Sequence, residues 1–251
     1  MFRKIIIFFI SLMYFSNGVS SELKFSGLLY THYKISKNGN NEFDISRLYL
    51  TGKKEISKNI GFRFTTDIGR VSNSDEKKFY RLYLKYAYIS FDNLLYDNSN
   101  IKIGQHYLPL LTYLENNVWK YRSIGKMMLD LEGYQTSSDM GIGLSGKFLN
   151  NKKGVYTISI VNGEGFANPE INKNKGIYSQ LTFPFLFSKQ NISSFISYTN
   201  KIKTYTILFD GTVHKTIYGI ELSYCENSHN KAKGYSFFQH TKVLNDINKM
   251  L

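Results

Sequence analysis

Five basic residues occupy positions at which chemistry with anions is expected. They are Arg47, Arg63, Arg81, Lys85 and Lys102. The neighbours two positions away are mostly polar or small, and residues two apart in a β-strand share one face. Each cation is therefore expected on the wet face of its strand. Guanidinium and ammonium groups attract phosphate or chloride electrostatically, so we expect attraction of small anions rather than the making of bonds.

Two alternative roles for these cations follow from the sequence. In a membrane barrel, a charge at mid-height on the lipid face costs about 2–4 kcal/mol, which favours the water-filled lumen. There the cations would form a ladder that lowers the barrier to anions and still lets them leave. In the alternative, the arginines pair with Asp67, Asp44 or Glu221 and brace the wall. Asp67 is expected mainly as a structural partner of lumen arginines.

A second group of charged residues lies on a long segment without a strand pattern. The segment from Pro109 to about Ser137 carries Glu115, Lys120 and Arg122. A connection of this length is uncommon and usually functional. We expect it to fold into the lumen, where these three side chains would set a constriction. If it caps the mouth instead, they are ordinary solvated charges.

Other kinds of site are not expected. Gly141 to Lys147 reads G-I-G-L-S-G-K, but Phe148 follows where a phosphate-binding loop has Ser or Thr, and the segment alternates like a strand. The five histidines and Cys225 have no metal-ligand spacing. No nucleophile motif or carboxylate pair supports catalysis. We therefore predict no enzyme, cofactor, metal or nucleic-acid partner.

The elements that must position these residues show a period of two. Between Asn59 and Gly69, three apolar residues alternate with polar ones: Ile60, Phe62 and Phe64 against Gly61, Arg63, Thr65 and Asp67. Between Phe79 and Phe91, one face is expected toward lipid and carries Tyr80, Leu82, Leu84, Tyr86 and Tyr88. The other face is expected toward the lumen and carries Arg81, Tyr83 and Lys85. This alternation predicts strands with one apolar and one charged face.

The same rhythm predicts about twelve strands along the chain. They span residues 23–33, 43–54, 59–69, 79–91, 101–108, 139–148, 155–161, 177–185, 192–199, 204–209, 215–225 and 234–241. Their spacing is that of a meander. The predicted fold class is all-β, a transmembrane antiparallel up-and-down β-barrel in one domain, residues 22–251.

Targeting and composition agree with export. Arg3 and Lys4 precede an apolar run and then small residues, which predicts a signal peptide over residues 1–21. That run is too short for a comfortable transmembrane helix. The single cysteine cannot form an internal disulfide, so the exported protein must be stable without one. A net charge of +13 favours an anionic partner, although a bias toward lysine would also raise it.

With the strands placed, the order of several loose motifs resembles the phosphate-selective porin O and P family. The motifs are F-D-I-S-R-L-Y-L-T-G at Phe43–Gly52, F-R-F-T-T-D at Phe62–Asp67, Y-L-K-Y-A-Y at Tyr83–Tyr88, I-K-I-G-Q-H-Y-L-P-L at Ile101–Leu110, V-N-G-E-G at Val161–Gly165, F-P-F at Phe183–Phe185 and G-Y-S-F-F at Gly234–Phe238. The resemblance implies a homotrimeric barrel of 16 strands in the outer membrane, in contact with its lipid. It also implies a basic lumen and passive, often anion-preferring diffusion of small anionic solutes.

Three departures from the family pattern affect these expectations. Ser46 precedes Arg47 where the family often has paired arginines, and Gln239 and His240 stand where a basic residue is usual. The sequence also stops at Leu251, too early for the last strands. Because an unpaired strand edge cannot lie in lipid, either the chain is C-terminally truncated or it closes as a smaller barrel of about 12 strands.

Two other classes of protein fit part of the same pattern. One is a non-conducting outer-membrane surface protein or adhesin whose basic loops meet acidic sugars. The other is an exported soluble β-sandwich that binds an anionic ligand, in which the tyrosines at strand ends would be half-buried.

Overall fold

The computed structural model describes residues 22–70, 80–149, 153–185, 189–227 and 230–241. The expected signal peptide, residues 1–21, lies outside them. The strands are β1 (Lys24–Ile35), β2 (Asn41–Ser57), β3 (Ile60–Arg70), β4 (Tyr80–Asp92), β5 (Ser99–Tyr107), β6 (Ser138–Phe148), β7 (Gly154–Val161), β8 (Gly176–Pro184), β9 (Gln190–Tyr198), β10 (Ile202–Val213), β11 (Thr216–Asn227) and β12 (Lys231–Thr241).

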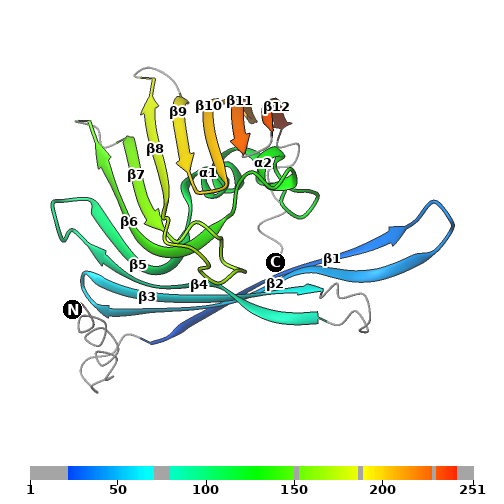
Figure 1. The fold of residues 1–251 in the computed structure, drawn as a ribbon, viewed down its shortest axis with the longest axis horizontal. Coiled ribbons are helices and arrows are strands. Elements are labelled where there is room, and N and C mark those ends of the chain that lie inside the picture. The colour runs from blue at the N-terminus through cyan, green and yellow to red at the C-terminus, as the bar shows by residue number, and fades with distance from the viewer. Residues whose placement is uncertain (1–21, 71–79, 150–152, 186–188, 228–229, 242–251) are drawn as a thin grey trace.

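The strands form one meander that curves around a hollow (Figure 1). In the described residues, the twelve strands lie in a single sheet in chain order, and each is antiparallel to the next. Every strand expected from the sequence corresponds to one of them. The fold class is confirmed as an all-β, antiparallel up-and-down sheet. Because the described strands form one curved layer rather than two packed sheets, the structure does not fit the alternative of a β-sandwich.

The polarity of this sheet is reversed relative to a soluble sandwich. Along β10, Tyr205 and Ile207 are exposed on the outer face, whereas Thr204 and Thr206 are buried on the inner, concave face. The other strands of this wall repeat the pattern, with outer residues such as Ile196 and Leu222. The outer face is thus apolar, and the inner face is mostly polar, except where β9 to β12 pack against the segment between β5 and β6.

The inner face gains part of its order from paired hydroxyl groups. Thr51 Oγ1 lies 2.9 Å from Thr65 Oγ1 across β2 and β3, and Thr206 Oγ1 lies 2.8 Å from Ser223 Oγ across β10 and β11. Buried hydroxyls are costly when unpaired. Each pair therefore links two neighbouring strands through polar side chains on the inner face.

The segment between β5 and β6 lies inside the hollow, as the sequence predicts. It contains α1 (Pro109–Tyr113), the π-helical turn η1 (Leu114–Trp119) and α2 (Met128–Leu131), and Figure 1 shows α1 and α2 on the concave side of the sheet. We call residues 108–137 the inner segment. Its apolar side chains form a core with residues of β9 to β12: Leu110, Leu111, Leu114, Val118, Met127, Leu129, Phe195, Leu208, Cys225 and Phe238.

Polar contacts add to this packing. Tyr113 donates a hydrogen bond of 3.0 Å to Asp210 on β10, and the side-chain amide of Gln135 donates one of 2.7 Å to Ser197 on β9. His240 Nε2 on β12 donates to the carbonyl of Val118 at 2.9 Å. The inner segment is thus attached to one half of the wall, and its other side faces β2 to β4.

The two edges of the sheet are not joined to each other. Within the described residues, β1 pairs only with β2 and β12 only with β11. The expectation that about 12 strands close into a smaller barrel is therefore not met in this structure. In Figure 1 the β1–β2 hairpin extends well beyond the rest of the sheet.

The two ends of the sheet differ in their connections. Among the described connections, both long ones, 108–137 and 162–175, lie at one end together with 36–40 and 199–201, and 58–59, 93–98 and 214–215 lie at the other. We call these the long-loop end and the short-turn end.

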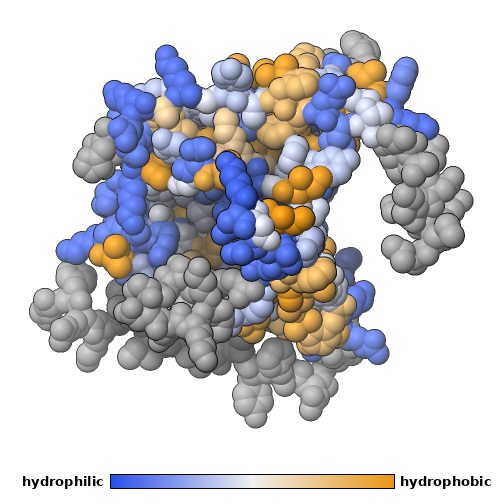
Figure 2. Space-filling view, turned by 90° about the vertical axis from the view of Figure 1, so that its right-hand side faces the viewer, coloured by the Kyte–Doolittle hydropathy of each residue, from blue (hydrophilic) through white to orange (hydrophobic). Residues whose placement is uncertain are grey.

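Figure 2 views the side from which the β1–β2 hairpin projects, and hydrophilic residues dominate its centre with hydrophobic groups beside them. In the described part of the chain, no helix is long and apolar enough to span a membrane.

Candidate functional site

The charged residues of β2 to β4 meet the inner segment around Arg47. The Arg47 guanidinium is buried, and its Nη1 lies 3.1 Å from Glu115 Oε1 of the inner segment. Its Nε lies 3.9 Å from Asp67 Oδ2, and its Cζ lies 4.6 Å from the centre of the Tyr49 ring. The sequence suggested a pairing of arginines with Asp67 and treated Glu115 separately, as a constriction residue. The structure joins them in one network that links the wall to the inner segment.

Asp67 organises the strand side of this network. Its Oδ1 accepts hydrogen bonds from the backbone N–H of Leu48 at 3.2 Å and of Ile68 at 2.9 Å, and its Oδ2 accepts one from the Tyr83 hydroxyl at 3.1 Å. These three donors fix the position of the carboxylate between β2, β3 and β4. The structural role expected for Asp67, as a partner of a lumen arginine, is the one its contacts show.

Two β-bulges aim the site residues inward. The register between β1 and β2 shifts at Ser46, and the register between β3 and β4 shifts at Lys85, the extra residue between Leu84 and Tyr86. A bulge reverses the alternation that follows it. Tyr86 and Tyr88 therefore lie on the inner face, where Arg63 Cζ is 4.8 Å from the Tyr86 ring centre and Tyr88 is buried. The prediction that both tyrosines face lipid is wrong.

Lys85 is held by neutral groups. Its ammonium donates to the hydroxyl of Ser137 on the inner segment, and its Nζ lies 3.6 Å from the centre of the Phe166 ring. Among the described residues it has no ion pair with a carboxylate. Lys85 thus lacks a direct ion pair among the described residues, in contrast to Arg47, and we call such a cation uncompensated.

A cavity of about 320 Å³ separates this part of the wall from the inner segment. Its basic lining residues are Arg47, Lys85, Arg122 and Lys126, and its acidic ones are Asp67, Glu115 and Asp130. Aromatic rings of Tyr49, Tyr83 and Phe166 complete the walls. The cations exceed the carboxylates, so a small anion is the charge-complementary occupant.

The remaining cations of the expected ladder lie at different heights on the inner face. The strand register gives their order from the long-loop end to the short-turn end as Arg81, Lys85, Arg63 and Lys102. Arg81 is exposed opposite Gly69, whereas Lys102 is buried, donates to Asn100 and lies 4.9 Å from the Tyr107 ring centre. Arg63 Nε donates to Thr65 at 3.1 Å. The four cations thus form a row along the strand direction, from one end of the sheet towards the other.

The three residues expected at a constriction have different environments. Glu115 contacts Arg47, as described, and Arg122 Nη2 lies 2.9 Å from Asp130 Oδ2 within the inner segment. Lys120 is exposed, with a positive φ of 57° at the end of η1. Glu115 and Arg122 line the cavity, and Lys120 does not.

The bracing partners differ from two of those expected. Asp44 Oδ2 lies 3.2 Å from the Lys34 ammonium. Glu221 is fully buried and accepts hydrogen bonds from Ser223 at 3.2 Å and Ser236 at 2.9 Å. Of the three carboxylates considered, Asp67 contacts Arg47. Arg47 is therefore braced, while Lys85, Arg63 and Lys102 are held by uncharged groups.

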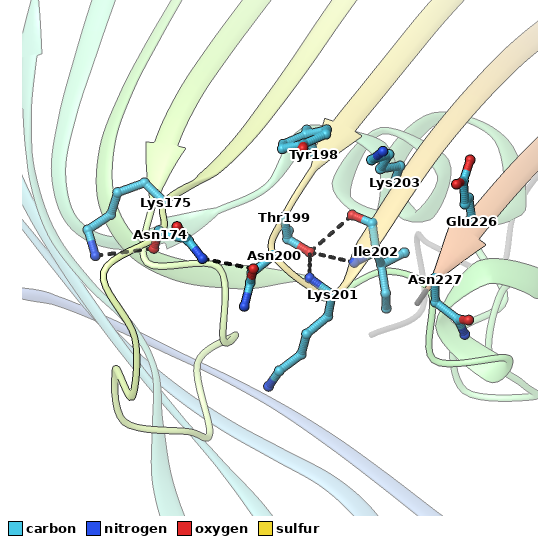
Figure 3. A pocket seen from close by; sticks show the side chains of 10 residues that line it. All are labelled: Asn174, Lys175, Tyr198, Thr199, Asn200, Lys201, Ile202, Lys203, Glu226 and Asn227. Carbon is cyan, nitrogen blue, oxygen red and sulfur yellow. Dashed lines mark hydrogen bonds between the residues drawn. The ribbon is translucent and has the colours of Figure 1, made fainter. Parts of the chain in front are cut away.

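A second hollow of about 420 Å³ lies at the long-loop end between β8 and β11 (Figure 3). Lys175, Lys201 and Lys203 line it, but Figure 3 shows their side chains pointing in different directions. Lys201 pairs with Glu164, and Lys175 Nζ lies 2.7 Å from Glu170. This ion pair and hydrogen bond hold the pKa of the exposed Glu170 carboxyl below its ordinary value. The hollow therefore belongs to the rim and lacks convergent charges.

Some other groups in the sequence have structural roles. Gly141 to Lys147 lies within β6, so it is a strand and not a phosphate-binding loop. In the described residues, no group of three His, Cys, Asp or Glu side chains is placed to hold a metal ion. Burial raises the pKa of the Tyr113 hydroxyl above its ordinary value, and the neighbouring Asp210 carboxylate raises it further.

The most important residue that the sequence did not indicate is Phe166. It follows Gly163 and Gly165, which have positive φ angles of 99° and 81°. Asp139 on β6 accepts hydrogen bonds from both of their N–H groups, at 2.7 and 3.1 Å. These glycines stand in the V-N-G-E-G motif, and that motif was the available signal that the connection has a fixed shape. Nothing in it shows that the next residue reaches β4.

Comparison with known proteins gives information on the fold alone. No protein-family model matches the chain, and no curated protein matches it by sequence. The crystal structure of Pseudomonas aeruginosa OpdK with vanillate aligns with a TM-score of 0.53 at 10% identity, over 85% of this chain and 60% of that chain. The shared fold is that of a porin β-barrel. P. aeruginosa OccK2 (OpdF) in complex with glucuronate gives a TM-score of 0.48 at 11% identity, over 87% and 60%.

These findings limit the resemblance read from the sequence. The chain spans about 60% of the length of the OpdK structure. Because no family model matches, the comparisons do not support membership of the phosphate-selective porin O and P family. The porin fold itself stands on the structural likeness.

Proposed function

We propose that this protein is a passive diffusion channel of the outer membrane for small solutes, with a preference for anions. The observation that carries the proposal is the reversed polarity of the sheet. Ile207 and Leu222, cross-strand neighbours on β10 and β11, are both exposed on the outer face, whereas Thr206 and Ser223 are buried on the inner face. In water such an outer face would be an aggregation surface, whereas in lipid it is the low-energy arrangement.

The cations on the inner face support the anion preference. Arg81, Lys85, Arg63 and Lys102 follow one another from end to end of the sheet. A row of partly satisfied cations attracts an anion at each level and holds it weakly enough for release. The vanillate in the OpdK structure is an anion as well. Phosphate and chloride are the simplest small anions that this row of cations would attract. Selectivity for phosphate is part of the same proposal.

The setting of the channel is part of the same proposal. We place it in the outer membrane in contact with lipid, exported by the signal peptide over residues 1–21, and assembled as a homotrimer. In barrels of this kind short turns face the periplasm and long loops face outward. The start of β1 and the connection 58–59 would then lie on the periplasmic side, and the inner segment would enter from outside.

Single-channel recording tests whether the protein conducts. The mature chain would be refolded in detergent, inserted in a planar bilayer and recorded in potassium chloride. Discrete, stable current steps are expected. An inserted protein that gives no steps would contradict the channel and favour the second candidate function.

The second candidate is a non-conducting surface anchor. The observation in its favour is the inner segment, which packs with a core of buried side chains against β9 to β12 and occupies part of the hollow. A segment that fills the lumen would stop diffusion. Binding of the protein to acidic sugars would test this candidate. Proteolytic removal of the exposed loops should then abolish the binding, and substitutions around Arg47 should leave it unchanged.

A further inference from the structure

The connection between β7 and β8 crosses the hollow and reaches the opposite wall. It spans residues 162–175, and its Phe166 ring stacks on Tyr83 of β4 with a centre-to-centre distance of 5.5 Å and an interplanar angle of 25°. The strands β7 and β4 are not neighbours in the sheet. A second loop, besides the inner segment, therefore narrows the space beside Arg47 and Lys85.

The base of this loop is fixed. Asp139 is buried and accepts hydrogen bonds from the N–H groups of Gly163 and Gly165. A Cβ atom at Gly165 would lie 3.1 Å from the Thr136 hydroxyl, and its φ of 81° favours glycine. The loop therefore presents Phe166 to β4 in a defined direction, and contact with Lys85 is a consequence of the fold.

The contact covers the one buried cation of the cavity that has no ion pair with a carboxylate in the described residues. Lys85 Nζ lies 3.6 Å from the Phe166 ring centre, so the ring covers one side of the ammonium. An aromatic face satisfies a cation without cancelling its charge, and the contact is stronger when water is excluded. Displacement of the ring would expose Lys85 to a passing solute.

We propose that Phe166 is a specificity-determining residue of the channel, which screens the Lys85 ammonium from permeating anions. This inference rests on the proposed function. The ring sets how much of the charge on Lys85 is felt in the lumen, whereas Arg47 is already balanced by Asp67 and Glu115. A smaller side chain at position 166 would open the same passage and raise its attraction for anions.

The test is a double-mutant cycle read by reversal potential in a planar bilayer under a potassium chloride gradient. Phe166→Ala is expected to raise the anion-to-cation permeability ratio by about two- to fivefold, the range that matches loss of a cation–π contact. In the Lys85→Gln background the same change is expected to leave the ratio unaltered, because the screened charge is gone. Phe166→Leu keeps most of the bulk and is expected to shift the ratio in the same direction by a smaller factor.

The matched control is Ile171→Ala, on the same loop and 71% exposed, which should behave as the wild type does. A ratio unchanged by Phe166→Ala and by Phe166→Leu in a conducting channel would overturn the role of Phe166 alone. An equal shift with and without Lys85 would also overturn it, because the ring would then act only as an obstacle. A silent wild type would refute the channel itself and this inference with it.

Discussion

At the scale of single residues, the site combines one compensated and several uncompensated cations. Arg47 is bound between Asp67 and Glu115, whereas Lys85, Arg63 and Lys102 contact hydroxyl, amide or aromatic groups. A compensated cation stabilises the wall, and an uncompensated one contributes potential to the lumen. Of the two roles that the sequence left open, the brace fits the contacts of Arg47, and the anion ladder stays a proposal for the other cations.

Arg63→Gln tests the contribution of one uncompensated cation. Removing a charge on the inner face, about halfway along the ladder, should lower the anion-to-cation permeability ratio by about two- to fivefold. The reversal potential of single channels measures this. Lys233→Gln is the matched control, because Lys233 is exposed on β12, far from the ladder in the sheet order. An equal effect of both variants would show that only total charge matters.

Asp67→Asn tests the brace. Asparagine keeps the size of the side chain but loses the charge facing Arg47 and weakens the acceptor for Tyr83, so we expect destabilisation of about 1–3 kcal/mol. The same change should raise anion preference, because Arg47 keeps only Glu115. Urea unfolding followed by gel mobility before and after boiling measures the first effect. An unchanged unfolding midpoint would contradict the bracing role.

At the scale of elements, alternation in the sequence was sufficient to locate the strands and insufficient to locate the bulges. Ile60, Phe62 and Phe64 oppose Arg63, Thr65 and Asp67 on β3 as the sequence predicts, because a regular strand preserves its period. The period of β4 changes at Lys85, because the bulge there depends on how β4 pairs with β3. A local sequence pattern contains no information on that pairing. The contact of Phe166 with β4 could not be predicted for the same reason, because it depends on the curvature of the whole sheet.

The docking of the inner segment can be tested through its core. Leu114 is fully buried against β9 to β12, and Leu114→Ala should cost about 2–5 kcal/mol of that packing. We expect noisier current with more frequent changes in step size, because the segment would leave the wall more often. Leu131→Ala, on α2 and 66% exposed, is the control and should conduct like the wild type. Identical records for both variants would show that the segment does not limit the current.

At the scale of the whole molecule, the outer face of the sheet decides the environment. Ile207 lies in the middle of β10 and is 55% exposed among other outward apolar residues. Strand number and the apolar face could be read from the sequence, because both depend on local alternation. Closure of the edges depends on partners for β1 and β12, and no local pattern in the chain specifies them.

Ile207→Arg tests the lipid-facing assignment. A charge at mid-height on the outer face should cost about 2–4 kcal/mol of folding free energy in a bilayer. Folding into liposomes, followed by heat-modifiable gel mobility, should show a clear loss for this variant. Ile171→Arg, on a loop, should fold like the wild type. Equal folding of both variants, or extraction of the protein without detergent, would contradict the membrane setting.

The measurement that tests the central claim most directly is the reversal potential of the wild-type channel in a planar bilayer under a potassium chloride gradient. A potential of anion sign is predicted, because the ladder from Arg81 to Lys102 gives the inner face an excess of positive charge. A potential of cation sign, or an inserted protein that carries no current, would contradict the account.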